Sequence, residues 1–176
     1  MKTYTRILTF ALAATMLTAC VNKEEKLRDA ISDYLVQEIG EQYLKGETCI
    51  PSLTIVAEEK NNPSDIRVWC DCWVFWYEQV GDTLKTVSGG NHSGLMTIEE
   101  KDGKYKVTAF EQTTDGTDFT PSAKRIFGEH YDAFQNIHSN NDEAEAARKE
   151  HLGDYVRRHN LSVQYYQDYG WDAVKL

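Results

Sequence analysis

Residues Arg67–Glu78 read RVWCDCWVFWYE and form the densest apolar and aromatic run of the chain after its first nineteen residues. The run is too short to cross a bilayer as a helix, and its β-branched and aromatic residues favour a long central β-strand. Alternation places one set of side chains on one face (Val68, Cys70, Cys72, Val74, Trp76) and another on the other (Trp69, Asp71, Trp73, Phe75, Tyr77). Both faces are apolar and need a cover, and one carboxylate lies among rings.

Around this strand the pattern predicts a helix followed by an antiparallel meander. Residues 22–44 carry apolar side chains at helical spacing, with Asn22 as N-cap and Gly46 as the stop. The other predicted strands are 53–58, 84–88, 95–100 and 105–112, with a flexible glycine-rich corner at 89–94 and a tight turn at Asp102-Gly103. The predicted fold class is α+β, with an N-terminal helix packed on a curved antiparallel sheet of about five strands.

After residue 112 the pattern becomes helical. Thr120-Pro121 offers an N-cap with proline at the first helical position, and helices are predicted at 122–127, 131–137 and 142–159. The tail, residues 161–176, is rich in tyrosine and tryptophan, which predicts a docked terminus. We expect one domain over residues 20–176: a helix and meander through 112, then a helical extension and an aromatic tail from 113.

The first twenty residues have the pattern of an export signal. Lys2 and Arg6 precede the uncharged apolar run 7–17, which is too short for a membrane span. The sequence Leu17-Thr18-Ala19-Cys20 follows, and it resembles the lipobox of bacterial lipoproteins. The resemblance implies cleavage of residues 1–19, a diacylglyceryl group on the Cys20 sulfur and an acyl chain such as palmitate on the new amino terminus. The alternative is an ordinary signal with an unrelated cysteine.

The residues after Cys20 bear on where the protein would be anchored. Val21 stands where an aspartate would resemble the inner-membrane retention signal, which favours the outer membrane. Lys23-Glu24-Glu25 resembles a signal that sends some lipoproteins to the cell surface, but a charged helix start has the same composition. We expect a lipid-anchored protein of the bacterial cell envelope, facing the periplasm or the surface.

The charge of the chain argues against nucleic acid as a partner. Its formal charge is -9, and residues 1–19 hold two positive and no negative groups, so the chain without them carries -11. Nucleic-acid phosphates require a basic surface, which so acidic a domain does not offer.

The element order over residues 22–112 resembles the cystatin-like and nuclear-transport-factor-2-like group of α+β folds. The resemblance covers element order and no residue motif, and the helices that follow the sheet depart from the usual order of that group. The whole chain is also similar to small envelope lipoproteins of anaerobic bacteria with two membranes. The resemblance to the transport-factor-like group implies a cone-shaped pocket in which a carboxylate performs acid–base chemistry.

Three cysteines remain after lipidation of Cys20. Cys70 and Cys72 project from one face of one strand about 6.6 Å apart, so a bridge between them would be strained. We therefore expect either a disulfide from Cys49 to Cys70 or Cys72, which an exported compartment allows, or three buried thiols. The paired spacing of zinc ligands is absent, and we expect no metal and no cofactor.

Asp71 is the first candidate for chemistry, because Trp69 and Trp73 flank it on the same face. In a pocket it would serve as a general acid or base or would grip a ligand; the alternative is a carboxylate that faces solvent or pairs with a lysine. His92, in the glycine-rich corner, is the second candidate. The remaining histidines are expected on the surface of the late helices: His130, His138, His151 and His159.

The aromatic tail offers a binding surface. Tyr169 and Trp171, together with Trp69, Asp71 and Trp73, form the predicted ligand-binding set for a glycan, a protein or a small molecule. The alternative is a tail whose rings close the core. The sequence therefore favours a non-enzymatic binding module, with a cone-pocket enzyme that uses Asp71 on an apolar small molecule as the alternative. No serine-hydrolase, zinc-protease or phosphate-loop motif indicates a defined activity.

Overall fold

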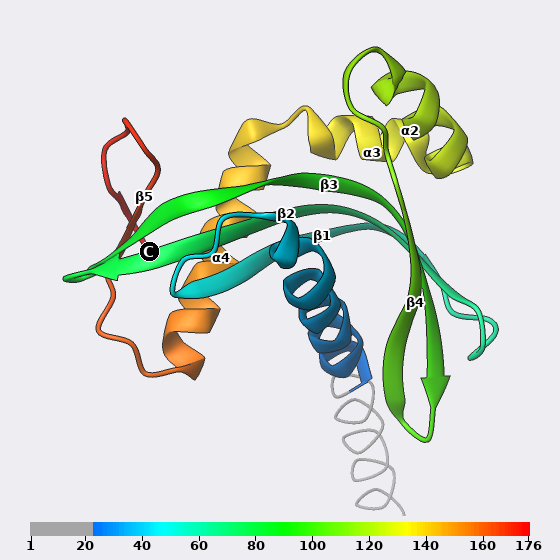
Figure 1. The fold of residues 1–176 in the computed structure, drawn as a ribbon. Helices are drawn as coiled ribbons and strands as arrows, with labels where there is room; N and C mark the ends of the chain where they lie inside the picture. Colours follow the sequence, from blue (N-terminus) through cyan, green and yellow to red (C-terminus); the bar gives the residue numbers. More distant parts are fainter. Residues whose placement is uncertain (1–22) are drawn as a thin grey trace, which may run out of the picture.

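The structure, a computed structural model, describes residues 23–176. The export signal, the lipidation site Cys20 and the N-cap Asn22 lie outside the described residues. The chain forms a helix at residues 23–42, four long strands, three α-helices and two short strands (Figure 1). The predicted α+β class, with one helix before the sheet and further helices after it, is confirmed. No helix within residues 23–176 is both long and apolar enough to cross a membrane.

Six strands form one mixed and strongly curved sheet (Figure 1). The antiparallel meander consists of β1 (Thr48–Glu59), β2 (Ile66–Val80), β3 (Thr83–Lys101) and β4 (Lys104–Gln112). The tail adds β5 (Tyr165–Gln167), which pairs in parallel with the start of β3, and β6 (Val174–Lys175), which pairs with β5. Between the segments paired with β4 and with β5, residues 86–93 of β3 have no strand partner on that edge among the described residues.

The strand β3 is continuous over 19 residues, so the predicted flexible corner at residues 89–94 is wrong. A Cβ atom on Gly89 would lie 2.1 Å from the carbonyl oxygen of Val74, and one on Gly94 would lie 2.1 Å from that of Glu111. These glycines therefore let neighbouring backbones approach closely, which a residue with a side chain would prevent. The sequence pattern does not separate this use from a loop.

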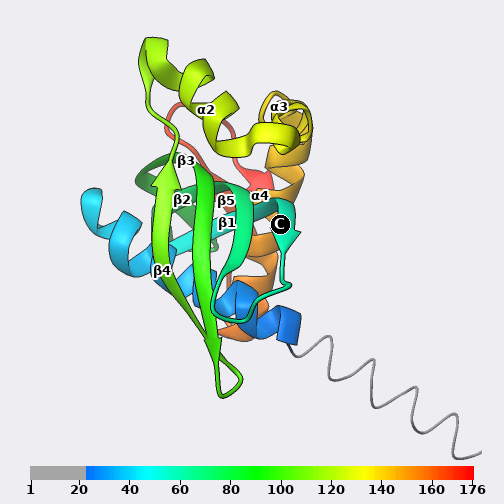
Figure 2. The same ribbon diagram turned by 90° about the vertical axis from the view of Figure 1, so that its right-hand side faces the viewer.

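The two faces of β2 are covered by different parts of the chain. The helix at 23–42 covers the first predicted face and forms the largest core with it: Leu27, Ile31, Leu35, Ile39, Val68, Cys70, Cys72 and Val74 are all buried. The other face is covered by α2 (Phe119–Phe127), α3 (Tyr131–His138) and α4 (Asn141–Arg158) (Figure 2), and the side chain of Tyr166 from β5 packs there as well. The predicted late helices and their break near Gly128 are confirmed, but α2 begins at Phe119 after Asp118, so the predicted N-cap at Thr120 is wrong.

The C-terminal end of the first helix is shaped by Gly40. Residues Leu35–Ile39 form a π-helical turn and Gly40–Gln42 a 3-10 turn. The indole N–H of Trp76 donates to the carbonyl oxygen of Gly40 at 2.8 Å. This bond ties the helix end to β2 and brings Gln42 and Tyr43 to the open edge of β3.

The cysteines on the first face are free thiols in the structure. Cys49 lies opposite Trp76 across β1 and β2, whereas Cys72 lies four residues further along β2, which is roughly 13 Å. A disulfide needs Cα atoms within about 7 Å. The predicted bridge from Cys49 to Cys70 or Cys72 is therefore absent. Burial raises the pKa of the Cys49 thiol to about 11.

Candidate functional site

The face of β2 that carries Trp73 is covered but not filled. Trp73 lines three cavities between this face and the late helices. The aromatic cavity, of about 710 Å³, lies between Trp73, α4 and the tail. The polar cavity, of about 690 Å³, lies at the open edge of β3 beside α3, and the small cavity, of about 320 Å³, lies between Asp71 and α4. The two larger volumes are within the ~300–1,000 Å³ of ordinary small-molecule sites.

Asp71 is 4 % exposed and lies at the centre of a hydrogen-bond network. Asn91 Nδ2 and Ser93 Oγ donate to its Oδ1 at 2.6 and 2.9 Å. His138 Nδ1 lies 3.2 Å from its Oδ2. A buried carboxylate requires such donors, because an unpaired charge is costly in a low dielectric. Asp71 therefore neither faces solvent nor pairs with a lysine.

His138 is held by two rings as well as by Asp71. The ring centroids of Phe119 and Phe134 lie 5.1 and 5.0 Å from that of the imidazole, each inclined by 29°. A hydrogen bond to a carboxylate, which only accepts, requires a proton on Nδ1 of His138, and in the neutral tautomer with that proton Nε2 is an acceptor. His138 lines the polar cavity. The expectation that it is a simple surface group is wrong, because α3 ends against β2.

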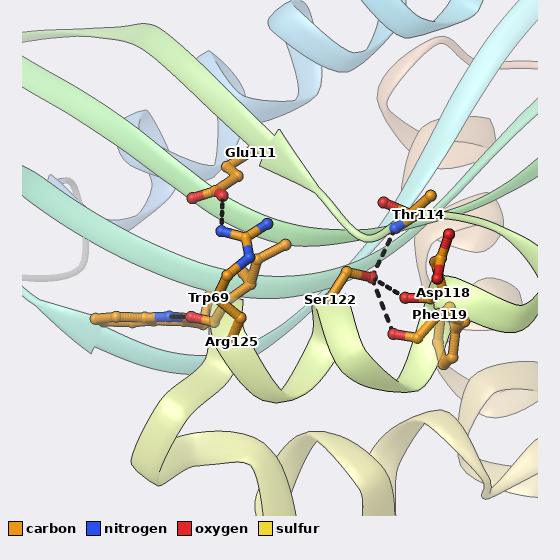
Figure 3. Close-up of polar contacts among 8 residues, drawn as sticks. Trp69, Glu111, Thr114, Asp118, Phe119, Ser122 and Arg125 are labelled. Atoms are coloured by element: carbon orange, nitrogen blue, oxygen red, sulfur yellow. Dashed lines mark hydrogen bonds and ion pairs between the residues drawn. The ribbon is translucent and has the colours of Figure 1, made fainter.

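Ser122 fixes the start of α2 (Figure 3), and Phe119 of this first turn lies against the His138 ring. The Ser122 hydroxyl donates toward the carbonyl oxygen of Asp118 at 2.7 Å and accepts from the backbone N–H of Thr114 at 2.9 Å. The loop before the helix and the first helical turn are thus joined at one atom. This arrangement places Phe119 at the wall of the polar cavity.

Trp69, predicted to bind ligand, is a core residue. It is 7 % exposed, and its indole N–H donates to the carbonyl oxygen of Ile126 at 2.9 Å (Figure 3). The His130 ring packs against it at 4.6 Å. Trp69 lines none of the three cavities and serves to attach α2 to the sheet.

His92 lines the polar cavity, as its sequence position suggested. Its side chain projects from the face of β3 opposite to the face that carries Asn91. The Tyr43 hydroxyl lies 2.8 Å from its Nε2, and Gln112 Oε1 lies 2.7 Å from its Nδ1. Burial, followed by the charge of Asp115, raises the pKa of Tyr43, so its hydroxyl remains a donor. His92 and His138 therefore reach one cavity around the open edge of β3, each through its own network.

Arg148 lines the aromatic cavity and is 7 % exposed. Its guanidinium donates twice to Asp168, at 2.7 Å each, and once to the Tyr77 hydroxyl at 3.0 Å. The same group lies 4.3 Å from the ring centroid of Phe75 and 4.8 Å from that of Tyr166. Burial opposes the charge, but the hydrogen bonds to Asp168 and Tyr77 keep the pKa of Arg148 above its ordinary value. The hydrogen bond from Arg148 in turn lowers the pKa of Asp168.

The rest of the aromatic cavity is acidic and ring-lined. Asp142, Glu145 and Asp172 line it, and none of them has a side-chain hydrogen bond or ion pair to another described residue. Trp171, which is 76 % exposed, and Trp73 face the same space. Two rings of the predicted ligand-binding set therefore line this cavity.

Tyr169 is 98 % exposed and does not line the aromatic cavity. The tail is nevertheless docked, because Tyr166 is only 1 % exposed and lies in the core under α4. Tyr166 therefore closes the core, as the alternative for the tail expected, whereas Tyr169 and Trp171 remain exposed.

Most of the residues that line these cavities were not predicted from the sequence, and two of them, Arg148 and His138, carried a signal. Arg148 falls on the apolar stripe of the predicted helix, four residues after Ala144 and four before Leu152. His138 falls four residues after the buried Phe134. A polar group at the i+4 position of an apolar stripe is the signal that could have identified both.

One cluster within residues 23–176 has donor atoms arranged for a metal ion. Glu59, Glu129 and His130 place theirs within 4.8 Å of one another. Both glutamates are exposed, and the cluster is separate from the three cavities. We assign no ion to it.

Comparison with protein-family models, with curated proteins and with solved structures finds no significant match to this chain. Its function is therefore inferred from the residues that line the two larger cavities.

Proposed function

We propose that this chain is a lipid-anchored cell-envelope protein that binds a ligand with a cationic group in the aromatic cavity. The observation that carries the proposal is the charge of that cavity. Asp142, Glu145 and Asp172 line it without partners among the described residues, while the charge of Arg148 is neutralised by Asp168. A cation in this space would therefore meet uncompensated negative charge.

The rings of the cavity favour the same ligand. A cation over the face of a tryptophan gains about 0.5–2 kcal/mol, and more where water is excluded. Trp73 is held in place by stacking on Phe75, with centroids 5.6 Å apart and planes inclined by 12°. Trp171 is exposed and can close over a ligand that enters. An ammonium or guanidinium group, on a small molecule or on a side chain of a partner protein, fits these features.

The anchor would leave the cavity accessible. Lys23, where the described helix begins, is three positions after Cys20, a reach of at most ~11 Å. Figure 1 shows the start of this helix at one end of the molecule and α2, α3 and the first turns of α4 at the other. A lipid on Cys20 would hold the start of this helix at the membrane and direct the end with α2 and α3 away from it.

Binding is tested with the full chain in detergent, titrated with spermidine, choline and arginine methyl ester by calorimetry. At least one of these cations is expected to bind, with an affinity that falls as salt rises. Trp171→Ala and Glu145→Gln are each expected to weaken binding by roughly threefold to thirtyfold. Binding of a basic peptide but of no free cation would identify a protein partner as the source of the group.

The matched control is Tyr169→Ala, which removes an exposed ring two positions from Trp171 and outside the aromatic cavity. This variant is expected to bind as the unaltered chain does. Equal loss in Tyr169→Ala and Trp171→Ala, or no binding of any cation or basic peptide, would contradict the proposal.

The anchor is tested separately. Labelling growing cells with an alkyne analogue of palmitate is expected to mark the chain, and Cys20→Ser is expected to abolish the label and release the protein from the outer-membrane fraction. Unchanged fractionation of Cys20→Ser would remove the lipid anchor and leave the cavity proposal standing.

A second candidate function is enzymatic, and the pairing of Asp71 with His138 favours it. Three donors occupy Asp71, so it would orient His138, whose Nε2 would act as the general base. Among residues 23–176, no serine or cysteine lines the polar cavity, and we expect the base to act on water or on a substrate hydroxyl. Hydrolysis of any compound in an ester, amide and glycoside panel, lost in His138→Gln, would support this function.

A further inference from the structure

We propose that the polar cavity is a second binding site, which takes a neutral polyhydroxylated ligand of the sugar type. The inference goes beyond the cation site in the aromatic cavity and does not depend on it. Its first support is charge: among residues 23–176, no lysine or arginine lines the polar cavity, and Asp115 is the one carboxylate that does. Phosphate and carboxylate ligands would therefore lack the lysine or arginine partner that usually binds them.

The second support is the kind of polar group that lines the cavity. Asn91, Gln112 and Asn141 carry amides, and His92 and His138 carry imidazoles. An amide presents a donor and an acceptor in one plane, and a carboxylate presents two acceptors. Each hydroxyl of a sugar both donates and accepts, so neighbouring hydroxyls match such planar pairs. An apolar ligand would leave unpaired the cavity groups that have no partner among the described residues, such as Nε2 of His138 and the amide of Asn141, at about 1–3 kcal/mol for each group that it covers.

The third support is the presence of two ring walls. Trp73 and Phe119 line the cavity, and each is fixed by a second ring, Phe75 for Trp73 and His138 for Phe119. Aromatic faces provide apolar contact for the C–H faces of a sugar while the cavity groups bind its hydroxyls. A rigid wall also loses little entropy when a ligand binds.

The fourth support is that the polar groups are already positioned. Tyr43, His92 and Gln112 form a chain with links of 2.8 and 2.7 Å, and Asp71 orients His138. Nε2 of His138 has no hydrogen-bond partner among residues 23–176, so it remains available to accept from a ligand hydroxyl.

The site is tested with the full chain, in a detergent without a sugar headgroup, on an array of neutral and anionic glycans. A neutral oligosaccharide is expected to bind and to shift the indole N–H resonance of Trp73. Asp115→Ala is expected to weaken binding at least tenfold while the urea midpoint stays unchanged. The control is Asp118→Ala, which removes an exposed carboxylate three positions away that does not line the cavity.

Four outcomes would overturn the inference: no neutral glycan bound, only anionic glycans bound, full affinity in Asp115→Ala, or equal loss in Asp118→Ala. Loss of sugar binding in Trp171→Ala together with full affinity in Asp115→Ala would place the sugar in the aromatic cavity and would also overturn it. Undiminished sugar binding by a chain that binds no cation would support this site and contradict only the proposed cation site.

Discussion

Asp71 and Arg148 are the two charged side chains that are buried among the described residues, at 4 % and 7 % exposure, and they are neutralised in different ways. Arg148 meets an ionised partner, Asp168, and gives further hydrogen bonds to Tyr77 and Thr86. Asp71 receives two neutral donors and one imidazole. Asp71 projects from the face of β2 that the late helices cover, and Arg148 reaches the same face from α4 through its hydrogen bond to Tyr77.

The difference indicates two roles. The pairing of Arg148 with Asp168 fastens α4 to the tail and leaves the charge of the aromatic cavity to other carboxylates. The neutral donors of Asp71 come from β3, so its third contact fixes the imidazole of His138 at the polar cavity. One buried charge therefore stabilises the fold, and the other positions a group that a ligand can reach.

The largest effect is expected from Asp168→Ala, which leaves Arg148 buried without its ionised partner. Loss of one member of a buried pair typically costs 3–5 kcal/mol, and the part exposure of Asp168 sets the expectation at about 3 kcal/mol of unfolding free energy. Urea denaturation measures it. The control is Asp172→Ala, for which a change within about 0.5 kcal/mol is expected; similar losses in both would show that Arg148 needs no partner.

Asp71→Asn is expected to cost about 2 kcal/mol, because it replaces charge-assisted hydrogen bonds by neutral ones. The amide would also present a donor to His138, so the proton of the imidazole should move from Nδ1 to Nε2. Long-range nitrogen–proton NMR spectra report this tautomer directly. An unchanged tautomer would separate Asp71 from the positioning role.

Two matched deletions of a hydroxyl compare the networks at finer scale. Ser93→Ala removes a donor to Asp71 from a residue with no exposed surface, and about 1.5 kcal/mol should be lost. Thr86→Val removes a donor to Asp168. Because Asp168 still accepts from Arg148, a loss of less than about 1 kcal/mol of unfolding free energy is expected. Urea midpoints of both variants provide the test, and the reverse order would contradict the contrast between the two sites.

The smallest effect is expected in acid. The hydrogen bond from Arg148 lowers the pKa of Asp168 below its ordinary value of 3.8. A lowered pKa in the folded state contributes stability above the unfolded value, and this contribution is lost as the pH falls from 3.8 through the folded pKa. The unaltered chain should therefore lose more stability below that pH than Asp168→Asn. An equal loss of unfolding free energy in the two proteins as the pH falls would contradict the ion pair.

Local patterns along the chain were sufficient for much of the fold. Alternation over Arg67–Glu78 identified the central strand and the membership of its two faces, because the side-chain period of a strand is independent of what packs on it. Helical spacing identified the first helix and the three late ones for the same reason. Trp73, Asp71 and Trp171 could be named as site candidates from their type and spacing alone.

Tertiary contacts decided the rest. The sequence pattern around Gly89 and Gly94 predicts a loop, but close contacts with neighbouring backbones place both residues within a strand. The strand β5 is too short for its sequence pattern to predict. Register across β1 and β2 kept Cys49 apart from Cys72, which no spacing in the sequence states. The pairing of Asp71 with His138 joins positions 67 residues apart. The sequence by itself therefore determined the elements and their apolar faces, because these depend on local periodicity. The packing of the helices across the sheet decided the partner of each buried charge and the positions of the cavities.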